Sequence, residues 1–437
     1  MSLNDREDTS VLPATSQDLN SMISRYFLRC PGCDKPFTAR IGIDTADNTR
    51  FYLPCPICKV SIRGQMDGDD LASHRINFEC EVIQEDDLSN DSPIITINPF
   101  VPSRYDADSF DGLGAFPTMT LHSLLGGERF LAFQGEHGQG REVAQELWPT
   151  VRMLFEYFLQ QNWAMFEKTA INKFGVKSVG STMHQRTTIA YQAVLTATVN
   201  ILGTSLTGTD YLLERFHRKY RRAVRSANYI DFLREQAATI RQLERDVFLA
   251  LDHFITKYEV WAMGRLPRWV DDNAKRDLED LTLFRDEFTT ARDLYQQGFE
   301  ASCKCLWILM ATQNSVKQAD PNNFGDTHPD MVPTTRRVSS IAQYNRLSNS
   351  RKLAYVEMVP GWEVLPKLLS SQQRNAIGHG TARHDLLNGR VYIDKDSQGV
   401  TYLRFLEETF GAFEALSILM QVLRSARIAT SPDFKNP

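Results

Sequence analysis

The chain is 437 residues long and 42% hydrophobic, yet it has no continuous apolar run of about 18 residues, the length that begins to suggest a transmembrane helix. The run that comes nearest, Ile189 to Leu206, is interrupted by Gln192, Asn200 and several threonines. We therefore expect no membrane span. The length and the composition instead predict two or three globular domains.

The sequence also lacks a strong net charge. Its formal charge is −5 at pH 7, so the chain does not have the overall basic character of many nucleic-acid-binding proteins. RNA, if it binds, must meet a local basic patch. Residues 1–10 are polar and acidic and do not resemble a secretory signal, so we expect a cytosolic protein. Residues 1–20 show no hydrophobic periodicity and are predicted to be a disordered tail.

Cysteine is scarce, with seven residues in the chain, but four of the seven form two Cys-x-x-Cys pairs. Cys30 and Cys33 are separated from Cys55 and Cys58 by 21 residues, which is close to the spacing of a structural four-cysteine zinc site. The alternative is a disulfide or a redox dithiol, which a reducing cytosol disfavours. Because four thiolates leave no open coordination position, we expect structural zinc and no catalytic metal.

Short strand candidates follow both cysteine pairs, at Phe37 to Ile43 and at Val60 to Arg63. This order is typical of a zinc ribbon, which we place at residues 21–66. Alternating residues further along predict a β extension at residues 67–101. Glycine, aspartate and proline are frequent at residues 102–140, which we interpret as a linker.

Helical periodicity begins after Gly140 and continues to the end of the chain, so residues 141–437 are predicted to be α-helical. The first apolar stripe consists of Leu147, Val151, Leu154, Phe155 and Phe158. The expected fold class is therefore mainly α, with a small N-terminal β-rich zinc ribbon.

One predicted helix carries an unusual concentration of cations on one face. These residues are candidates for contact with an RNA backbone, because like charges on one face repel each other unless an anion meets them. The alternative is a solvated face balanced by acidic neighbours such as Asp231, Glu235 and Glu244. The five basic residues are Arg215, Arg218, Lys219, Arg222 and Arg225.

Histidine is also infrequent, and among the nine histidines only His379 has an arginine five to seven residues before it. That arginine is Arg374, in the segment Ser371-Gln-Gln-Arg-Asn-Ala-Ile-Gly-His-Gly380. An arginine can hold a phosphate through two parallel hydrogen bonds, and a neutral imidazole can transfer a proton near pH 7. This combination suits cleavage of RNA without a metal.

Local signals predict that this segment is a short helix. Ser370 is a suitable N-cap with Gln373 three residues later, and Gly380 is a suitable C-terminal stop. Asn375 and His379 are four residues apart, so they share a helix face, and the amide can orient the imidazole. The alternative interpretation is a helix-capping histidine beside a surface arginine.

The string Arg374-Asn-Ala-Ile-Gly-His-Gly380 resembles the signature of the HEPN superfamily. Two strand-like segments, Gly389-Arg-Val-Tyr-Ile and Gly399-Val-Thr-Tyr-Leu, and then an apolar helix follow it, as the resemblance requires. The similarity covers roughly the C-terminal third of the chain, and we expect the HEPN-like part at about residues 280–430.

The resemblance implies a small helical domain that is usually dimeric. Many members are metal-independent endoribonucleases of defence or toxin systems, whereas others keep the fold without the chemistry. It further implies that Arg374, Asn375 and His379 are the catalytic residues. RNA is then the substrate and a homodimer the expected assembly, while the zinc ribbon is free to bind a nucleic acid or a protein.

Cleavage by the 2′-hydroxyl of RNA needs a base, an acid and positive charge at the phosphorane. A single chain supplies one histidine here. Two chains would supply two histidines and two arginines, which is the physical reason to expect a dimer. Alternatively, Arg383 and His384 contribute from just beyond the helix. The main alternative function is a non-catalytic module that binds RNA or protein, with the ribbon as a sensor.

Overall fold

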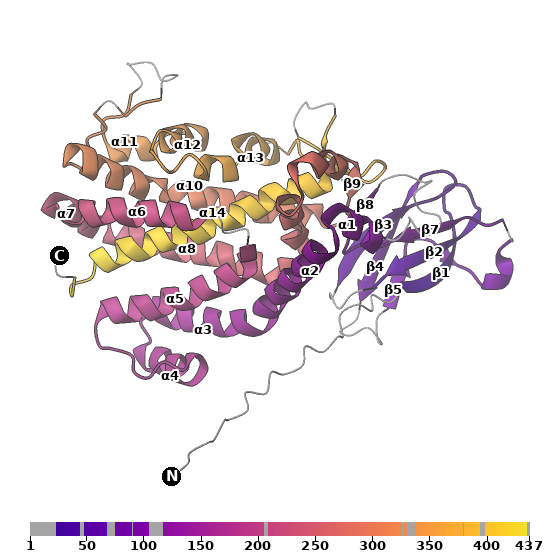
Figure 1. Cartoon of the computed structure of the whole chain (residues 1–437), viewed down its shortest axis with the longest axis horizontal. Coiled ribbons are helices and arrows are strands. Elements are labelled where there is room, and N and C mark those ends of the chain that lie inside the picture. The colour runs from indigo at the N-terminus through magenta and orange to yellow at the C-terminus, as the bar shows by residue number, and fades with distance from the viewer. Residues whose placement is uncertain are drawn as a thin grey trace, which may run out of the picture.

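The protein combines an N-terminal β region with a larger helical region, as the computed structural model in Figure 1 shows. The expected tail, residues 1–20, lies outside the described residues. The structure describes residues 23–43, 48–67, 75–89, 91–104, 117–204, 209–325, 327–329, 337–378, 380–393 and 398–434.

The β region is built from two hairpins, each of which gains further strands. In the first sheet, β1 and β2 are antiparallel, β6 pairs with β1, and β7 runs parallel to β2. In the second sheet, β3, β4 and β5 are antiparallel neighbours. The bounds are β1 Ile23–Arg29, β2 Pro36–Gly42, β3 Thr49–Pro54, β4 Ser61–Asp67, β5 Arg75–Phe78, β6 Glu81–Val82 and β7 Ile94–Ile97.

Aromatic side chains join the two sheets into one core. The ring of Phe78 lies 5.1 Å from that of Tyr26 and 6.0 Å from that of Phe51, both edge to face. Gly64 leaves room for Phe51, because a Cβ there would lie 2.4 Å from Cζ of the phenylalanine. The strands within residues 67–101 thus complete the same two sheets and do not form a separate extension.

The helical region is centred on two long helices, α10 and α14, which pack against each other and against α8. Most of α14 is buried on all sides, as expected for a helix inside a bundle. The main helices are α3 Trp148–Leu159, α4 Trp163–Phe174, α5 Met183–Leu202, α6 Thr209–Ala223, α7 Ala227–Glu235, α8 Ala237–Thr256, α10 Phe288–Gln318, α12 Asn349–Glu357, α13 Ser371–Gly378 and α14 Tyr402–Ala429. Within the described ranges, no helix is both long and apolar enough to cross a bilayer.

Shorter elements connect these helices. They are α9 Tyr258–Trp261, α11 Ile341–Asn345, 3-10 helices at Ala262–Arg268, Asp272–Asp280 and Leu365–Leu368, and the short strands β8 Ser103–Arg104, β9 Leu281–Thr282, β10 Arg383–Asp385, β11 Arg390–Tyr392 and β12 Val400–Thr401.

The linker prediction for residues 102–140 is wrong over most of the described part of that range. Two helices occupy it, α1 Pro117–Leu125 and α2 Gly127–Glu142, and a π-helical turn continues α2 into α3. Phe130 and Phe133 are buried, and Gly140 lets the helix approach Tyr258, whose Oη would lie 2.3 Å from a Cβ at that position. Tertiary packing therefore overrides the low helix propensity of the glycines.

A segment between the 3-10 helix at Asp272–Asp280 and α10 attaches the β region to the helices. Asp286 N–H donates to the carbonyl of Arg50 over 3.0 Å, and Tyr52 N–H donates to that of Phe284 over 3.1 Å. The Ser61 hydroxyl donates to the carbonyl of Leu386 over 2.6 Å, in the turn between β10 and β11. The β region thus contacts Leu386, which lies shortly after the end of α13 in the sequence.

Candidate functional site

The four cysteines of the two Cys-x-x-Cys pairs meet at one point of the β region. Their Sγ atoms all lie within 4.8 Å of one another. Cys30 Sγ is 3.5 Å from Cys58 Sγ, and Cys33 Sγ is 3.9 Å from Cys55 Sγ. Tetrahedral zinc with Zn–S bonds of about 2.3 Å places its sulfurs about 3.8 Å apart. The donor set and its spacing therefore fit a structural metal ion.

Both cysteine turns have the same backbone geometry. The N–H two residues after the first cysteine points to its sulfur, over 3.3 Å at Cys30 and 3.4 Å at Cys55. Asp34 and Lys59, each directly after the second cysteine, adopt left-handed φ angles of 57° and 64°. Their N–H groups close the turns on the carbonyls of Cys30 and Cys55, over 2.9 and 3.0 Å. Each turn thus places one N–H group against the sulfur of its first cysteine.

The surroundings of the thiols shift their pKa values in two directions. Burial raises the pKa of Cys55 to about 12 and also raises that of Cys30, whereas the backbone N–H of Val60 lowers the pKa of Cys58. A divalent cation would stabilise the thiolates that burial disfavours. All seven cysteines are free, so the disulfide alternative is not what the structure shows.

The predicted helix around Arg374 is present as α13, Ser371–Gly378. The N–H of Gln373 donates to the hydroxyl of Ser370 over 3.2 Å, which is the expected N-cap bond. Gly380 has a φ of 69°, and the N–H of Thr381 returns to the carbonyl of Ala376 over 2.9 Å. Local capping residues thus define both ends of the helix.

Arg374 and Asn375 are accessible on α13, whereas His379, the third predicted catalytic residue, lies outside the described residues. Arg374 is paired with Glu300 of α10, with its Nε 2.6 Å from Glu300 Oε1. Each of the two side chains is 33% exposed. Nη1 of the arginine lies 3.5 Å from Asn375 Oδ1. The guanidinium is therefore held in one orientation at a solvent-accessible position.

A further amide supports this ion pair. Asn349, the first residue of α12, donates from Nδ2 to Glu300 Oε2 over 2.9 Å. Glu300 thus accepts from both Arg374 and Asn349, which come from different helices. This contact could not be predicted from the sequence, because Glu300 is 74 positions before Arg374.

A second carboxyl group lies at the N-terminal end of α13. Burial raises the pKa of Glu408, on α14, to about 7, although nearby Arg404 and a hydrogen bond with Ser370 oppose the rise. The carbonyl of Ser370 also accepts from the hydroxyl of Tyr295 over 2.6 Å. Glu408 can therefore exchange a proton near neutral pH, a property that sequence reasoning missed.

The alternative pair beyond the helix, Arg383 and His384, has a packing role. The ring of His384 stacks on Tyr402 at 4.7 Å, and burial lowers its pKa to about 4. The guanidinium of Arg383 lies 4.6 Å from the ring centre of Tyr392. His384 is consequently neutral at pH 7, and its buried ring is poorly placed to exchange protons with a substrate.

Four of the five predicted RNA-binding residues line one groove of about 240 Å³ on α6. Lys219 Nζ donates to the carbonyl of Pro360 over 2.9 Å, and burial lowers the pKa of this lysine to about 8. Arg218 pairs with Glu214 over 2.7 Å, and Arg222 is exposed. The groove residues are Arg215, Arg218, Lys219, Arg222 and Pro360, whereas exposed Arg225 does not line the groove.

Two of the acidic neighbours proposed to balance this face have other partners. Glu244 is buried, 1% exposed, where it accepts from Tyr191 and faces Arg427. Asp231 pairs with Arg234. These two carboxylates therefore do not balance the groove, whereas Glu214 pairs with Arg218 and Glu363 acts electrostatically on Arg215 and Lys219.

The chain was compared with known protein families, curated proteins and solved structures. No protein family, curated protein or solved structure matches the chain.

Proposed function

We propose that the helical region is a HEPN-like domain and that the protein is a metal-independent endoribonuclease. The observation that carries the proposal is the arrangement of Arg374 on α13, where Glu300 and Asn375 orient a guanidinium that stays accessible to solvent. An oriented guanidinium offers two parallel donors to a phosphate. The resemblance of the segment to the HEPN signature supplies the reaction class.

In this proposal Arg374 binds the scissile phosphate and stabilises the charge of the phosphorane. His379 either accepts the proton of the attacking 2′-hydroxyl or donates a proton to the leaving 5′-oxygen. The products are a 2′,3′-cyclic phosphate and a 5′-hydroxyl. The bond from the 2′-oxygen to phosphorus forms as the bond from phosphorus to the 5′-oxygen breaks, so this step consumes no water and requires no metal. Because each chain supplies one such histidine, we propose that the active form is a homodimer.

The groove on α6 is proposed to bind the RNA backbone away from the cleavage site. Phosphate contacts position a nucleic acid without reading its sequence. The side chains of Arg222 and Arg225 make no hydrogen bond or ion pair with another residue of the described ranges, which leaves their guanidinium donors available. The groove therefore contributes affinity and salt dependence.

The four-cysteine cluster is proposed to hold structural zinc in a zinc ribbon. Cys30, Cys33, Cys55 and Cys58 would bind the ion, which would fix the two hairpins relative to each other. We propose that this ribbon binds a nucleic acid or a protein and that the protein acts in the cytoplasm, where thiols stay reduced. A defence or toxin role rests on the resemblance alone.

Expression of the wild type beside His379→Ala tests the proposal in cells. We expect the wild type to reduce host growth and to degrade RNA, and the variant to do neither at equal protein level. Equal loss of RNA in both strains would contradict the assignment.

A non-catalytic module is the second candidate, and the ion pair of Arg374 favours it. The carboxylate of Glu300 already neutralises the guanidinium, so a phosphate has to compete with it. In that case the helical region binds RNA or a protein through its basic groove, and the ribbon acts as a sensor. RNA binding without cleavage by purified wild-type protein would support this alternative.

A further inference from the structure

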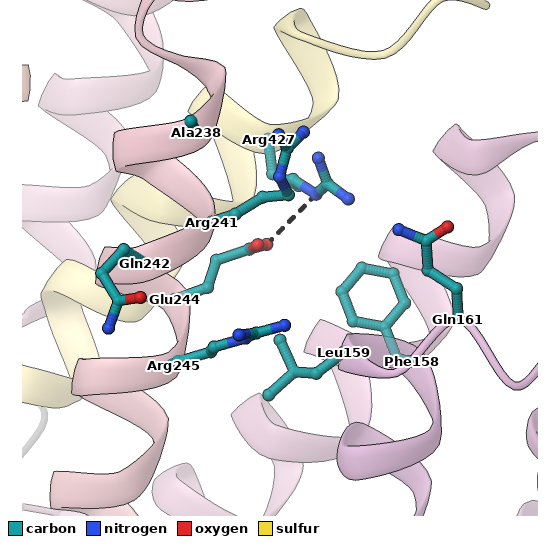
Figure 2. A pocket seen from close by; sticks show the side chains of 9 residues that line it. All are labelled: Phe158, Leu159, Gln161, Ala238, Arg241, Gln242, Glu244, Arg245 and Arg427. Atoms are coloured by element: carbon teal, nitrogen blue, oxygen red, sulfur yellow. Dashed lines mark ion pairs between the residues drawn. The ribbon is translucent and has the colours of Figure 1, made fainter.

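A second cationic cavity lies on another part of the helical region, where the C-terminal end of α3 faces α8 and the last turns of α14. It has a volume of about 210 Å³. Figure 2 shows Arg241, Glu244 and Arg245 projecting from one helix, with Arg427 from a second and Phe158 and Gln161 across the gap. This cavity shares no lining residue with the α6 groove, and none of the candidate cleavage residues lines it.

Arg427 is the buried member of the group, with 8% of its surface exposed. Its Nε lies 3.4 Å from Glu244 Oε1, but this buried nitrogen makes no hydrogen bond. The side chains of Arg241 and Arg245 are exposed and form no hydrogen bond or ion pair with another residue in the described part of the chain. A buried arginine that lacks a well-aligned acceptor is costly unless a ligand supplies one.

Glu244 is the only carboxylate among the residues that line this cavity. It is 1% exposed and accepts from the Tyr191 hydroxyl over 2.7 Å, while Arg427, Arg241 and Arg245 all act on it electrostatically. Burial raises its pKa to about 7. With Glu244 ionised, three guanidinium charges minus one carboxylate leave a surplus of two positive charges.

We propose that this cavity binds a phosphomonoester dianion, the terminal phosphate of a nucleotide or free inorganic phosphate. Guanidinium groups match phosphate oxygens with two parallel hydrogen bonds each, and the two surplus charges equal those of the dianion. A phosphodiester carries one charge and is the poorer match. The cavity is smaller than the 300–1,000 Å³ typical of ligand pockets, so it accommodates a phosphate group, and any nucleoside would lie outside it.

Calorimetric titration of the full-length protein with inorganic phosphate, AMP and adenosine at pH 8 tests the proposal. We expect saturable binding of phosphate or AMP and none of adenosine. Tighter binding of AMP identifies a nucleotide as the ligand, and equal binding identifies free phosphate. The double variant Arg241→Ala, Arg245→Ala should bind at least about tenfold more weakly, because two of the three charged donors are lost.

Two control variants separate this cavity from other cationic surfaces. Arg346→Ala removes an exposed arginine elsewhere, and the double variant Arg218→Glu, Arg222→Glu disables the α6 groove. Both should retain wild-type affinity. Because Arg241 and Arg245 are exposed, their variant should keep the wild-type melting temperature. The proposal is overturned if no phosphate ligand saturates, if adenosine binds like AMP, or if the Arg241, Arg245 variant binds as the wild type does.

Discussion

Arg374 of α13 and Glu300 of α10, 74 positions apart in the sequence, form an ion pair with Arg374 Nε 2.6 Å from Glu300 Oε1. The pair has two opposite consequences for a phosphate-binding arginine. It fixes the orientation of the guanidinium, and it places a negative charge where a phosphate must approach.

Replacement of this carboxylate separates the two effects. Glu300→Gln keeps the volume and one oxygen acceptor but removes the charge, so RNA should bind the same or more tightly. Glu300→Ala also frees the guanidinium, and we expect cleavage to fall roughly tenfold with RNA affinity retained. Single-turnover cleavage and filter binding measure the two quantities. Loss of binding in both variants together with loss of the folded state would show a purely structural role.

Zinc content tests the four-cysteine centre. Purified reduced protein should carry about one zinc per chain, because a closed set of four thiolates holds one tetrahedral ion. Cys30→Ser and Cys58→Ser should each lose the metal and lower the stability of the β region. Metal analysis and thermal unfolding record both effects.

Cys80 provides the matched control for the zinc centre, since it is a half-buried thiol of the same region outside the cluster. Cys80→Ser should retain the full zinc content. Freshly reduced wild type without metal would remove the zinc assignment altogether.

RNA affinity and its salt dependence test the basic groove on α6. The double variant Arg218→Glu, Arg222→Glu should bind RNA more weakly at low salt and show a smaller slope of log affinity against log salt, because fewer counterions are released. Both side chains are exposed, so folding should be unchanged. Arg346→Glu is the control at an exposed position outside the groove, and an unaltered slope in the double variant would assign these cations to a solvated surface.

Glu408 predicts a defined pH dependence of stability. Its pKa is raised in the folded state to about 7, so the folded protein binds the proton more tightly than the unfolded chain does. The wild type should therefore lose stability as pH rises from about 5 to about 7, and little further above. Glu408→Gln should lack this contribution. The unfolding free energy of the wild type minus that of the variant should therefore fall as pH rises over that interval. Urea titrations at pH 5 and pH 8 measure it, and a constant difference would contradict the shift.

Local signals predicted the parts of the molecule that depend on neighbouring residues. The N-cap Ser370 and the stop at Gly380 placed α13 to within about a residue, and the two Cys-x-x-Cys pairs identified the four thiols that meet. Strand candidates beside each cysteine pair became β2 and β4.

Contacts between distant segments could not be predicted in this way. Neither Glu300 nor Glu408 is near Arg374 in sequence, and the cavity of Arg241, Arg245 and Arg427 forms only when α8 and α14 pack. The helical state of α2 depends on burial of Phe130 and Phe133, which outweighs the four glycines of the helix. The parallel pairing of β7 with β2 joins residues more than fifty positions apart.

The central claim is that Arg374 and His379 cleave RNA without a metal. Two further variants test this claim. Arg374→Lys keeps the charge but loses the two parallel donors of the guanidinium, and Asn375→Ala removes the amide beside Arg374. Both should bind RNA and cleave it slowly. Mixing Arg374→Lys with His379→Ala tests whether a dimer completes one site from two chains.

The most direct measurement is the rate of RNA cleavage by wild type and His379→Ala in excess chelator, with analysis of the product ends. We predict that the wild type cleaves, leaves 2′,3′-cyclic phosphate or 3′-phosphate ends, and is unaffected by chelator, whereas His379→Ala binds RNA but loses at least about a hundredfold in rate. Cleavage by His379→Ala at the wild-type rate, or no cleavage by the wild type, would contradict the account.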